Sequence, residues 1–227
     1  MAKSAMISPS LTDEHTRRLL LRRRVILAAA ALFSGAALLS HIAMGVSLPF
    51  ALAVLASVVA AVCIVMWRRT PAAARELLKR LVIMGSAAGV IATVAYDGSK
   101  AIFSWLDPSP YNPFETIRIF GMLLSGATVP ALQYAIGAGF HLFNGVAFGV
   151  SFFMLLGRRG IVAGIAWGLG LECFQLSLYP GWLGITLYRE FVQFSVLGHM
   201  VYGAVLGFMC RRALQDRRIP EVIGRVV

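Results

Sequence analysis

The sequence predicts an all-α, polytopic membrane protein. We expect a bundle of six transmembrane helices plus one interfacial or re-entrant helix, with both termini in the cytoplasm. Apolar residues make up 59% of the 227 residues and charged residues only 14%, too apolar a composition for a soluble domain of this size. The apolar residues form runs of about 20, the length that crosses a bilayer core. The Lys and Arg residues that give the chain its net charge of +11 lie beside these runs, which indicates a topology signal rather than a nucleic-acid-binding surface.

The first part of the chain predicts a transmembrane hairpin over 25–67. Residues 1–24 form a basic cytoplasmic segment, and Val25 to about Gly45 is the first span. Leu48 to Trp67 is the second span, after a link so short that the two helices must be antiparallel. A signal peptide is the alternative for the first run, but that run is longer than the 7–15 apolar residues typical of such peptides.

The middle of the chain alternates between polar and apolar segments. Residues 68–80 are expected to form a basic cytoplasmic loop with a brief helix lying on anionic headgroups. Three prolines within 107–113 cannot continue a helix. The short apolar run from Phe114 to Ser125 therefore predicts the interfacial or re-entrant helix.

Residues 81–210 are expected to form a four-helix transmembrane core, followed by a basic cytoplasmic tail over 211–227. The four core spans are Leu81 to about Tyr96 (an extension to Leu106 stays open), Ala131–Leu156, Ile161–Leu178 and Phe191–Cys210. The segment Tyr179–Trp182 is expected to end its span as an aromatic anchor among the headgroups.

The distribution of lysine and arginine predicts the orientation. In the six-span arrangement, 18 of the 21 basic residues fall on the side that holds both termini. The other side carries only Lys100, Arg118 and Arg189. Cytoplasmic loops are enriched in Lys and Arg, so this asymmetry places both termini in the cytoplasm of a bacterial inner membrane.

Ionisable side chains inside the predicted spans are few, and each needs a reason because burial in lipid is costly. They are His41, Asp97, His141, Glu172 and His199, with Asn144 and Gln175 as polar companions. At 1.5 Å per residue, His141, Glu172 and His199 each lie about 10–15 Å from the outer end of their spans. We therefore expect a polar seam in the outer half of the bundle; its candidate members are Asp97, His141, Asn144, Glu172, Gln175 and His199. His41 could equally face the headgroups.

Glycine stripes place three of these residues on helix–helix contacts. Two spans share the pattern H-x-x-x-G-x-x-x-G, and a third carries two glycines and a glutamate at the same spacing. The stripes are His141, Gly145 and Gly149; His199, Gly203 and Gly207; and Gly164, Gly168 and Glu172. Small residues four apart let helices pack closely in lipid, so the three stripes are expected to bring His141, Glu172 and His199 to one point.

Several roles for this seam remain open from the residues alone. The three side chains could simply fix the packing, or they could line a pathway for protons or a solute. Two imidazoles and a carboxylate could also hold a metal ion, and His141 with His199 could ligate haem. The sequence assigns no cofactor, with a metal ion or haem as the alternatives. No zinc-protease helix, P-loop or dinucleotide fingerprint occurs, and the three separated cysteines imply no zinc site.

The C-terminal half, roughly residues 141–212, resembles the YagU-like small inner-membrane proteins. The residues that carry this resemblance are His141, Phe148-Gly149-Val150, Tyr179-Pro180, Tyr188-Arg-Glu190, Ser195, Gly198-His199-Met-Val-Tyr202 and Arg211-Arg212. A competing resemblance to the VanZ-like membrane family rests on His141, Glu172-Cys-Phe-Gln175, Pro180 and the last glycine-rich helix. This chain departs from the VanZ-like pattern by carrying Ser195 and His199 where that family has an acid and an asparagine. Both resemblances imply a bacterial inner-membrane protein with an envelope or stress-related role.

Three function classes follow from the sequence. The first is an envelope or stress-related factor, or a subunit of a membrane complex, with a structural polar seam. The second is a transporter of protons or a small solute, and the third is a metal- or haem-binding oxidoreductase. The partners we expect are the lipid bilayer and anionic headgroups at the cytoplasmic face, with a homo- or hetero-oligomer left open and no nucleic acid.

Overall fold

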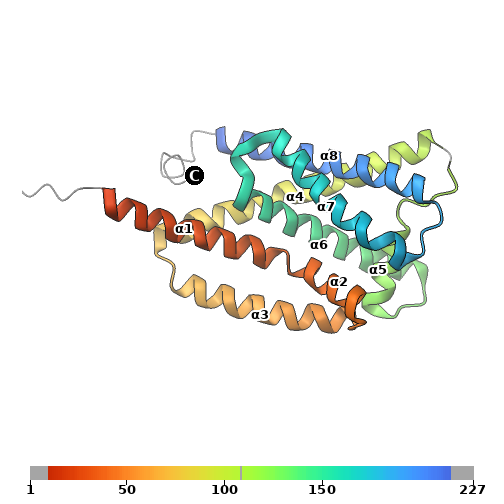
Figure 1. Ribbon diagram of the computed structural model, residues 1–227, viewed down its shortest axis with the longest axis horizontal. Coiled ribbons are helices and arrows are strands. Elements are labelled where there is room, and N and C mark those ends of the chain that lie inside the picture. The colour runs from red at the N-terminus through yellow and green to blue at the C-terminus, as the bar shows by residue number, and fades with distance from the viewer. Residues whose placement is uncertain (1–9, 108, 216–227) are drawn as a thin grey trace, which may run out of the picture.

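The computed structural model describes residues 10–107 and 109–215, and within them every regular element is helical (Figure 1). The elements are α1 (Ser10–Ala31), α2 (Phe33–Met44), α3 (Leu48–Arg68), α4 (Ala72–Leu106), α5 (Glu115–Ser125), α6 (Pro130–Leu156), the 3₁₀ turn η1 (Gly157–Arg159), α7 (Gly160–Leu183) and α8 (Tyr188–Gln215). The all-helical prediction is therefore confirmed.

Five of the described helices are long and apolar enough to cross a membrane: α3, α4, α6, α7 and α8. The pair α1–α2 passes the same test only as a unit, and it is bent by 44° at the break after Ala31. If this bent pair crosses as one segment, the count is six, as the sequence predicts. If it does not, the count is five.

The helix α4 begins earlier than predicted, at Ala72 rather than at Leu81. In the segment 68–80, expected to be a loop with a brief surface helix, only residues 69–71 are non-helical; residues 72–80 are the start of α4, which runs unbroken for 35 residues from Ala72. Pro71 occupies the N-cap position, and the residues that follow are mostly good helix formers, so nothing separates the two predicted parts. At 1.5 Å per residue α4 is about 50 Å long, so it extends beyond a bilayer core of about 30 Å.

The end of α7 also differs from the prediction. The helix continues through Pro180 to Leu183 and stops at Gly184, whose φ of 60° is a left-handed conformation that favours glycine. Trp182 packs against His41 and Phe120 rather than standing alone as an anchor. A proline inside a helix removes one hydrogen bond but leaves the remaining packing to hold the last turn.

The four-helix core consists of α4, α6, α7 and α8, with α4 packed against both α6 and α8, and α7 packed along α8 (Figure 1). Glycines set the close contacts. A side chain at Gly149 would strike the backbone of Gly85 and Gly89 on α4, and one at Gly203 would strike the backbone of Gly164 on α7. The stripe on α6 therefore faces α4, whereas the stripe on α8 faces α7.

The helix α5 packs on the first half of α6, and α1 packs on the same helix further along. A side chain at Gly121 of α5 would overlap the backbone carbonyl of Gln133, so the two helices touch backbone to backbone. The predicted interfacial or re-entrant helix is thus a short helix that covers one end of the core.

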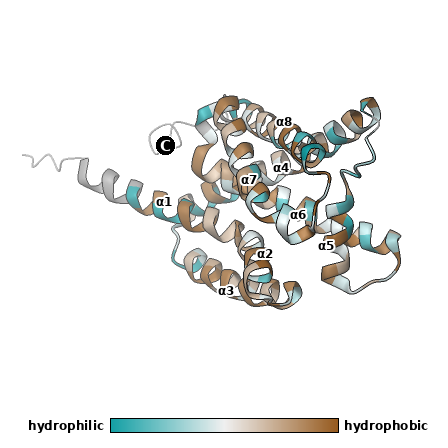
Figure 2. Cartoon of the chain, turned by 45° about the vertical axis from the view of Figure 1, so that its right-hand side comes forward, coloured by the Kyte–Doolittle hydropathy of each residue, from teal (hydrophilic) through white to brown (hydrophobic). Residues whose placement is uncertain are grey.

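The hairpin of α2 and α3 is peripheral, and α3 is almost entirely exposed (Figure 2). Its outward side chains are large and apolar; they include Phe50, Val54, Val58, Val62, Ile64 and Val65. Such a continuous apolar surface is suited to lipid rather than water. In Figure 1, α1 begins and α8 ends at the same end of the bundle.

Candidate polar cavity between the helices

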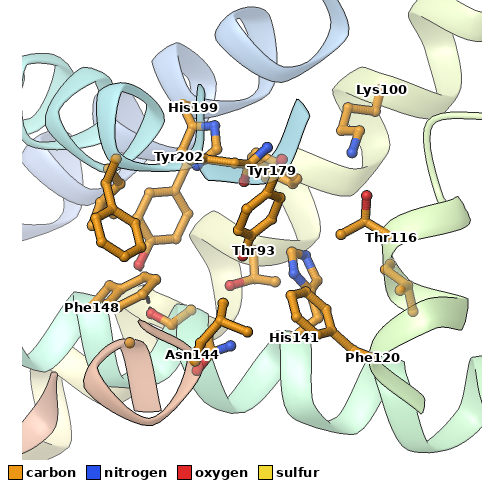
Figure 3. Close-up of a pocket in the computed structure, with 18 of the residues that line it drawn as sticks. Thr93, Lys100, Thr116, Phe120, His141, Asn144, Phe148, Tyr179, His199 and Tyr202 are labelled. Carbon is orange, nitrogen blue, oxygen red and sulfur yellow. Dashed lines mark hydrogen bonds between the residues drawn. The ribbon is translucent and has the colours of Figure 1, made fainter. Parts of the chain in front are cut away.

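A cavity of about 110 Å³ lies where α4, α6, α7 and α8 meet under α2 and α5 (Figure 3). A cavity needs roughly 10–15 Å³ of this kind of space to hold one water, so this one has room for several waters or a small molecule. Its polar lining comes from six helices and the loop before α5; the polar side chains are Ser34, Thr93, Tyr96, Lys100, Tyr111, Thr116, His141, Asn144, Gln175, Tyr179, His199 and Tyr202.

One carboxylate–imidazole pair joins α4 to α6. The Nε2 atom of His141 lies 3.1 Å from Oδ1 of Asp97, and because a carboxylate accepts, Nε2 carries the proton and donates it. Both side chains are partly open, at 26% exposed for His141 and 33% for Asp97. The contact of the α6 glycine stripe with α4 is what brings these two residues together.

A second pair joins α7 to α8 and is buried. The Nδ1 atom of His199 lies 2.7 Å from Oε2 of Glu172, and the Glu172 side chain is only 2% exposed. Ser195 donates its hydroxyl hydrogen to the same Oε2 atom at 2.6 Å, and Gln175 donates to the Ser195 oxygen at 2.7 Å. The Nδ1 atom of His199 also faces the Ser195 carbonyl at 3.0 Å. With acceptors on both sides, it must carry a proton.

The other carboxylate oxygen of Glu172, Oε1, is buried without a hydrogen-bond partner among the described residues. The Oδ1 atom of Asn144 is in the same condition, and Asn144 lines the cavity. Buried polar atoms are normally paired, so these two acceptors can take a proton, a water or a donor from a ligand.

The aromatic ring of Tyr96 contacts the imidazoles of both pairs. Its centroid lies 5.5 Å from the ring of His141 and 5.1 Å from the ring of His199. Gly198 permits this position, because a side chain there would overlap the Tyr96 ring. The helix contacts at the glycine stripes thus hold two carboxylate–imidazole pairs, each with its imidazole against the ring of Tyr96.

This arrangement bears on the predicted metal ligands His141, Glu172 and His199. Within the part of the chain that the structure describes, no three His, Cys, Asp or Glu side chains lie close enough to hold a metal ion together. His141 has its own partner in Asp97, and the Tyr96 ring contacts both imidazoles. The geometry therefore provides two two-residue pairs and does not assemble the three-ligand set.

His41 is the remaining ionisable residue of the predicted spans, and it stabilises the turn between α2 and α3. Its Nδ1 atom donates to the carbonyl of Val46 at 2.8 Å, across the turn from α2 to α3. Its ring packs edge-on against Trp182 at 5.6 Å. Gly45 makes this turn possible with a φ of 68°, so His41 stabilises a turn and lies outside the cavity lining.

Lys100 is a functional candidate that the sequence pattern does not single out, because a lone lysine near the outer end of a span reads as part of the outer-side charge. The structure places it on α4, one turn after Tyr96 and Asp97, and it lines the cavity at 8% exposure. A signal was available. If the third span extends to Leu106, Tyr96 and Lys100 lie four residues apart on one face.

The end of the cavity is closed by α5 and the loop before it. Arg118 pairs with Glu115 and donates to Oε1 of Gln133 at 2.9 Å, which ties α5 to α6. The hydrogen bond to Glu115 raises the pKa of Arg118 above its usual value. Tyr111 of the loop lines the cavity, and burial followed by the nearby Glu172 charge raises its pKa to about 12. Its hydroxyl is therefore a hydrogen-bond donor at neutral pH.

A comparison with family models places these residues in a known group. The family of unknown function DUF6789 matches residues 79–221, well over half of the chain. The chain belongs to this family. The DUF6789 match contains both carboxylate–imidazole pairs and Lys100, whereas α1, α2 and α3 lie before it. No curated protein and no solved structure matches the chain, and no named relative supports the YagU-like or VanZ-like resemblance.

Proposed function

We propose that this protein is a multi-pass protein of the bacterial inner membrane that binds a small solute in the cavity and moves it together with protons. The observation that carries this proposal is the cavity itself: about 110 Å³ of space between the helices is lined by a buried lysine and by His141 and His199, the imidazoles of the two carboxylate–imidazole pairs. If the polar seam served packing alone, its helices would be expected to pack without leaving a cavity, because helix–helix contacts in membranes are tight.

The two pairs have the chemistry of a proton path. Imidazole changes its charge near neutral pH, and carboxylates inside membranes are typical of proton relays. The Asp97–His141 pair is about one third open, whereas the Glu172 side chain is almost fully buried. A proton that enters at the open pair and reaches the buried one passes the polar face of the same cavity in which a solute would lie.

A second candidate function is a subunit of a membrane complex, which would also accommodate the envelope or stress-related role. The observation that favours it is the peripheral, apolar α3, of which only a small part packs on the rest of the chain. Lipid can cover such a helix, and so can a partner helix. The mass of the purified particle in a native membrane disc distinguishes a single chain from an assembly.

The proposal is tested with purified protein in liposomes that contain an entrapped pH-sensitive dye. A panel of small carboxylates, amines and neutral solutes is added outside, and the internal pH is followed. We expect at least one class of solute to change the internal pH faster than in protein-free liposomes. A panel in which no solute does so would contradict the transport function.

A further inference from the structure

Lys100 stands apart from the other ionisable groups of the cavity. Its side chain is 8% exposed, and it extends toward the cavity from α4 (Figure 3). The contacts of its ammonium group are the faces of two aromatic rings, at 4.9 Å from the centroid of Tyr96 and 5.6 Å from that of Phe114. In the described part of the chain, no carboxylate lies within 4 Å of it and no hydrogen bond from it is formed.

A buried ammonium without a carboxylate in direct contact is costly, so its presence needs a reason. Cation–π contacts recover part of this cost but not all of it. The carboxylates of Asp97 and Glu172 act on Lys100 only from beyond salt-bridge distance, and each already contacts an imidazole, that of His141 and that of His199. The positive charge of Lys100 is thus left for a group that enters from outside the chain.

The chemistry around Lys100 limits what that group can be. One lysine supplies one charge and suits a monoanion, whereas phosphate carries up to two charges and three or more acceptor oxygens, which call for more donors than one lysine and one hydroxyl. The Thr116 hydroxyl points toward Lys100 from α5 and forms no hydrogen bond among the described residues (Figure 3). It can donate a second hydrogen bond to a carboxylate oxygen.

The rest of the cavity wall is aromatic and suits an apolar body. The rings that line it are those of Phe120, Phe148, Phe174, Tyr179 and Phe191. Together, a single cation at one side and rings around the remainder match an anion with an apolar part. The volume of about 110 Å³ limits that part to a short chain or a single ring.

We infer that Lys100 and Thr116 form the anion subsite of this cavity and bind the carboxylate of a small organic monoanion whose apolar part lies among the aromatic rings. This inference rests on the proposed solute function and names its substrate class. Carboxylates can arrive either as free acids from water or as fatty acids from the bilayer, and the structure favours the small free acid because of the cavity volume.

The experiment measures binding by calorimetry, with the protein in discs of zwitterionic lipid. The probes are benzoate, its neutral isostere benzamide, inorganic phosphate and dodecanoate. We expect benzoate to bind at least tenfold more tightly than benzamide and phosphate, and dodecanoate to gain nothing over benzoate. This comparison uses the unaltered protein, so it does not depend on how a variant folds.

A matched pair of variants tests the assignment to Lys100. Lys100→Met should weaken benzoate binding at least tenfold, whereas Lys79→Met, at an exposed position on the same helix, should leave it unchanged. Because Lys100→Met also removes a buried charge, the melting temperature of the ligand-free protein should rise by about 2 °C or more.

The inference is overturned if benzamide binds as well as benzoate, if Lys100→Met retains full affinity, or if only dodecanoate or phosphate binds. Its failure is separable from that of the proposed function. Flux of neutral or cationic solutes without carboxylate binding would remove the anion subsite and leave transport standing. Carboxylate binding without any flux would remove the transport function and leave the anion subsite standing.

Discussion

At the scale of single residues, the partner of each ionisable side chain decides what the cavity can do. In the structure His141 pairs with Asp97, and His199 pairs with Glu172. Each carboxylate therefore has one nearby imidazole, and the proton that the two share can move without leaving an isolated charge in a poorly solvated site. The Lys100 ammonium contacts two aromatic rings and forms no salt bridge within the part of the chain that the structure describes.

This pairing makes a prediction about energetic coupling. In double-mutant cycles with alanine, Asp97 with His141 and Glu172 with His199 should each show a coupling of about 0.5–3 kcal/mol in the free energy of unfolding. His141 with His199 should couple less than either pair, because each imidazole contacts its own carboxylate and both share only the Tyr96 ring. Equilibrium unfolding in mild detergent measures all three cycles. A coupling of the two histidines larger than that within the pairs would mean that they form a joint site.

The sequence could predict Asp97, His141, Glu172 and His199 as seam members because the cost of burying ionisable groups in lipid singles them out. It could not predict how they pair. The two H-x-x-x-G-x-x-x-G stripes are identical in pattern, and only the packing shows that one faces α4 and the other α7. Tertiary contacts also decide the hydrogen bonds of Ser195 and the contacts of the Tyr96 ring with both imidazoles.

At the scale of helices, glycine contacts hold the core in register. Along α7 and α8, the backbones approach so closely that a side chain on either glycine stripe would overlap the opposite backbone. Because the stripes carry Glu172 and His199 at one end, the same contact that packs the helices also sets the distance between the carboxylate and the imidazole. Packing and site geometry are therefore linked.

Substitution of one glycine tests this link. Gly203→Ala should lower the free energy of unfolding by about 1–3 kcal/mol, because the new methyl group meets the Gly164 backbone. Gly170→Ala is the matched control on α7, where no neighbouring atom lies within 4 Å. It should be neutral or slightly stabilising, since alanine favours a helix by up to about 1 kcal/mol over glycine. Equal losses in the two variants, measured by thermal unfolding, would contradict close packing of α7 on α8.

The helix boundaries show where sequence reasoning loses resolution. Spans are recognised from apolar runs, so a polar stretch such as 68–80 reads as a break even when its residues favour helix. In the structure α3 ends at Arg68, and residues 72–80 are the first part of α4, which continues from there without a break. At its other end α4 runs on to Leu106, so Lys100 is part of the helix and lines the cavity. With a span that ends near Tyr96, Lys100 would instead fall in the loop.

At the scale of the whole molecule, the charge distribution predicts the orientation. With 18 basic residues on one side and 3 on the other, both termini should be cytoplasmic. A reporter that is active only in the periplasm should be silent when fused to the C-terminus and active when inserted at Ser109. The opposite result at either position would overturn this topology.

The central claim is that the polar groups of the cavity carry protons with a solute and do more than fix the packing. It is tested most directly by the rate of internal pH change in solute-driven liposomes that contain Glu172→Gln. Glutamine keeps the size of the side chain and can still accept from Ser195, but it cannot carry a proton. Glu76→Gln, in an exposed pair with Arg80 on α4, is the control. We predict that Glu172→Gln inserts and folds yet loses at least tenfold in rate, while Glu76→Gln keeps the unaltered rate. Equal rates in the two variants would contradict the claim and leave the cavity groups with a packing role alone.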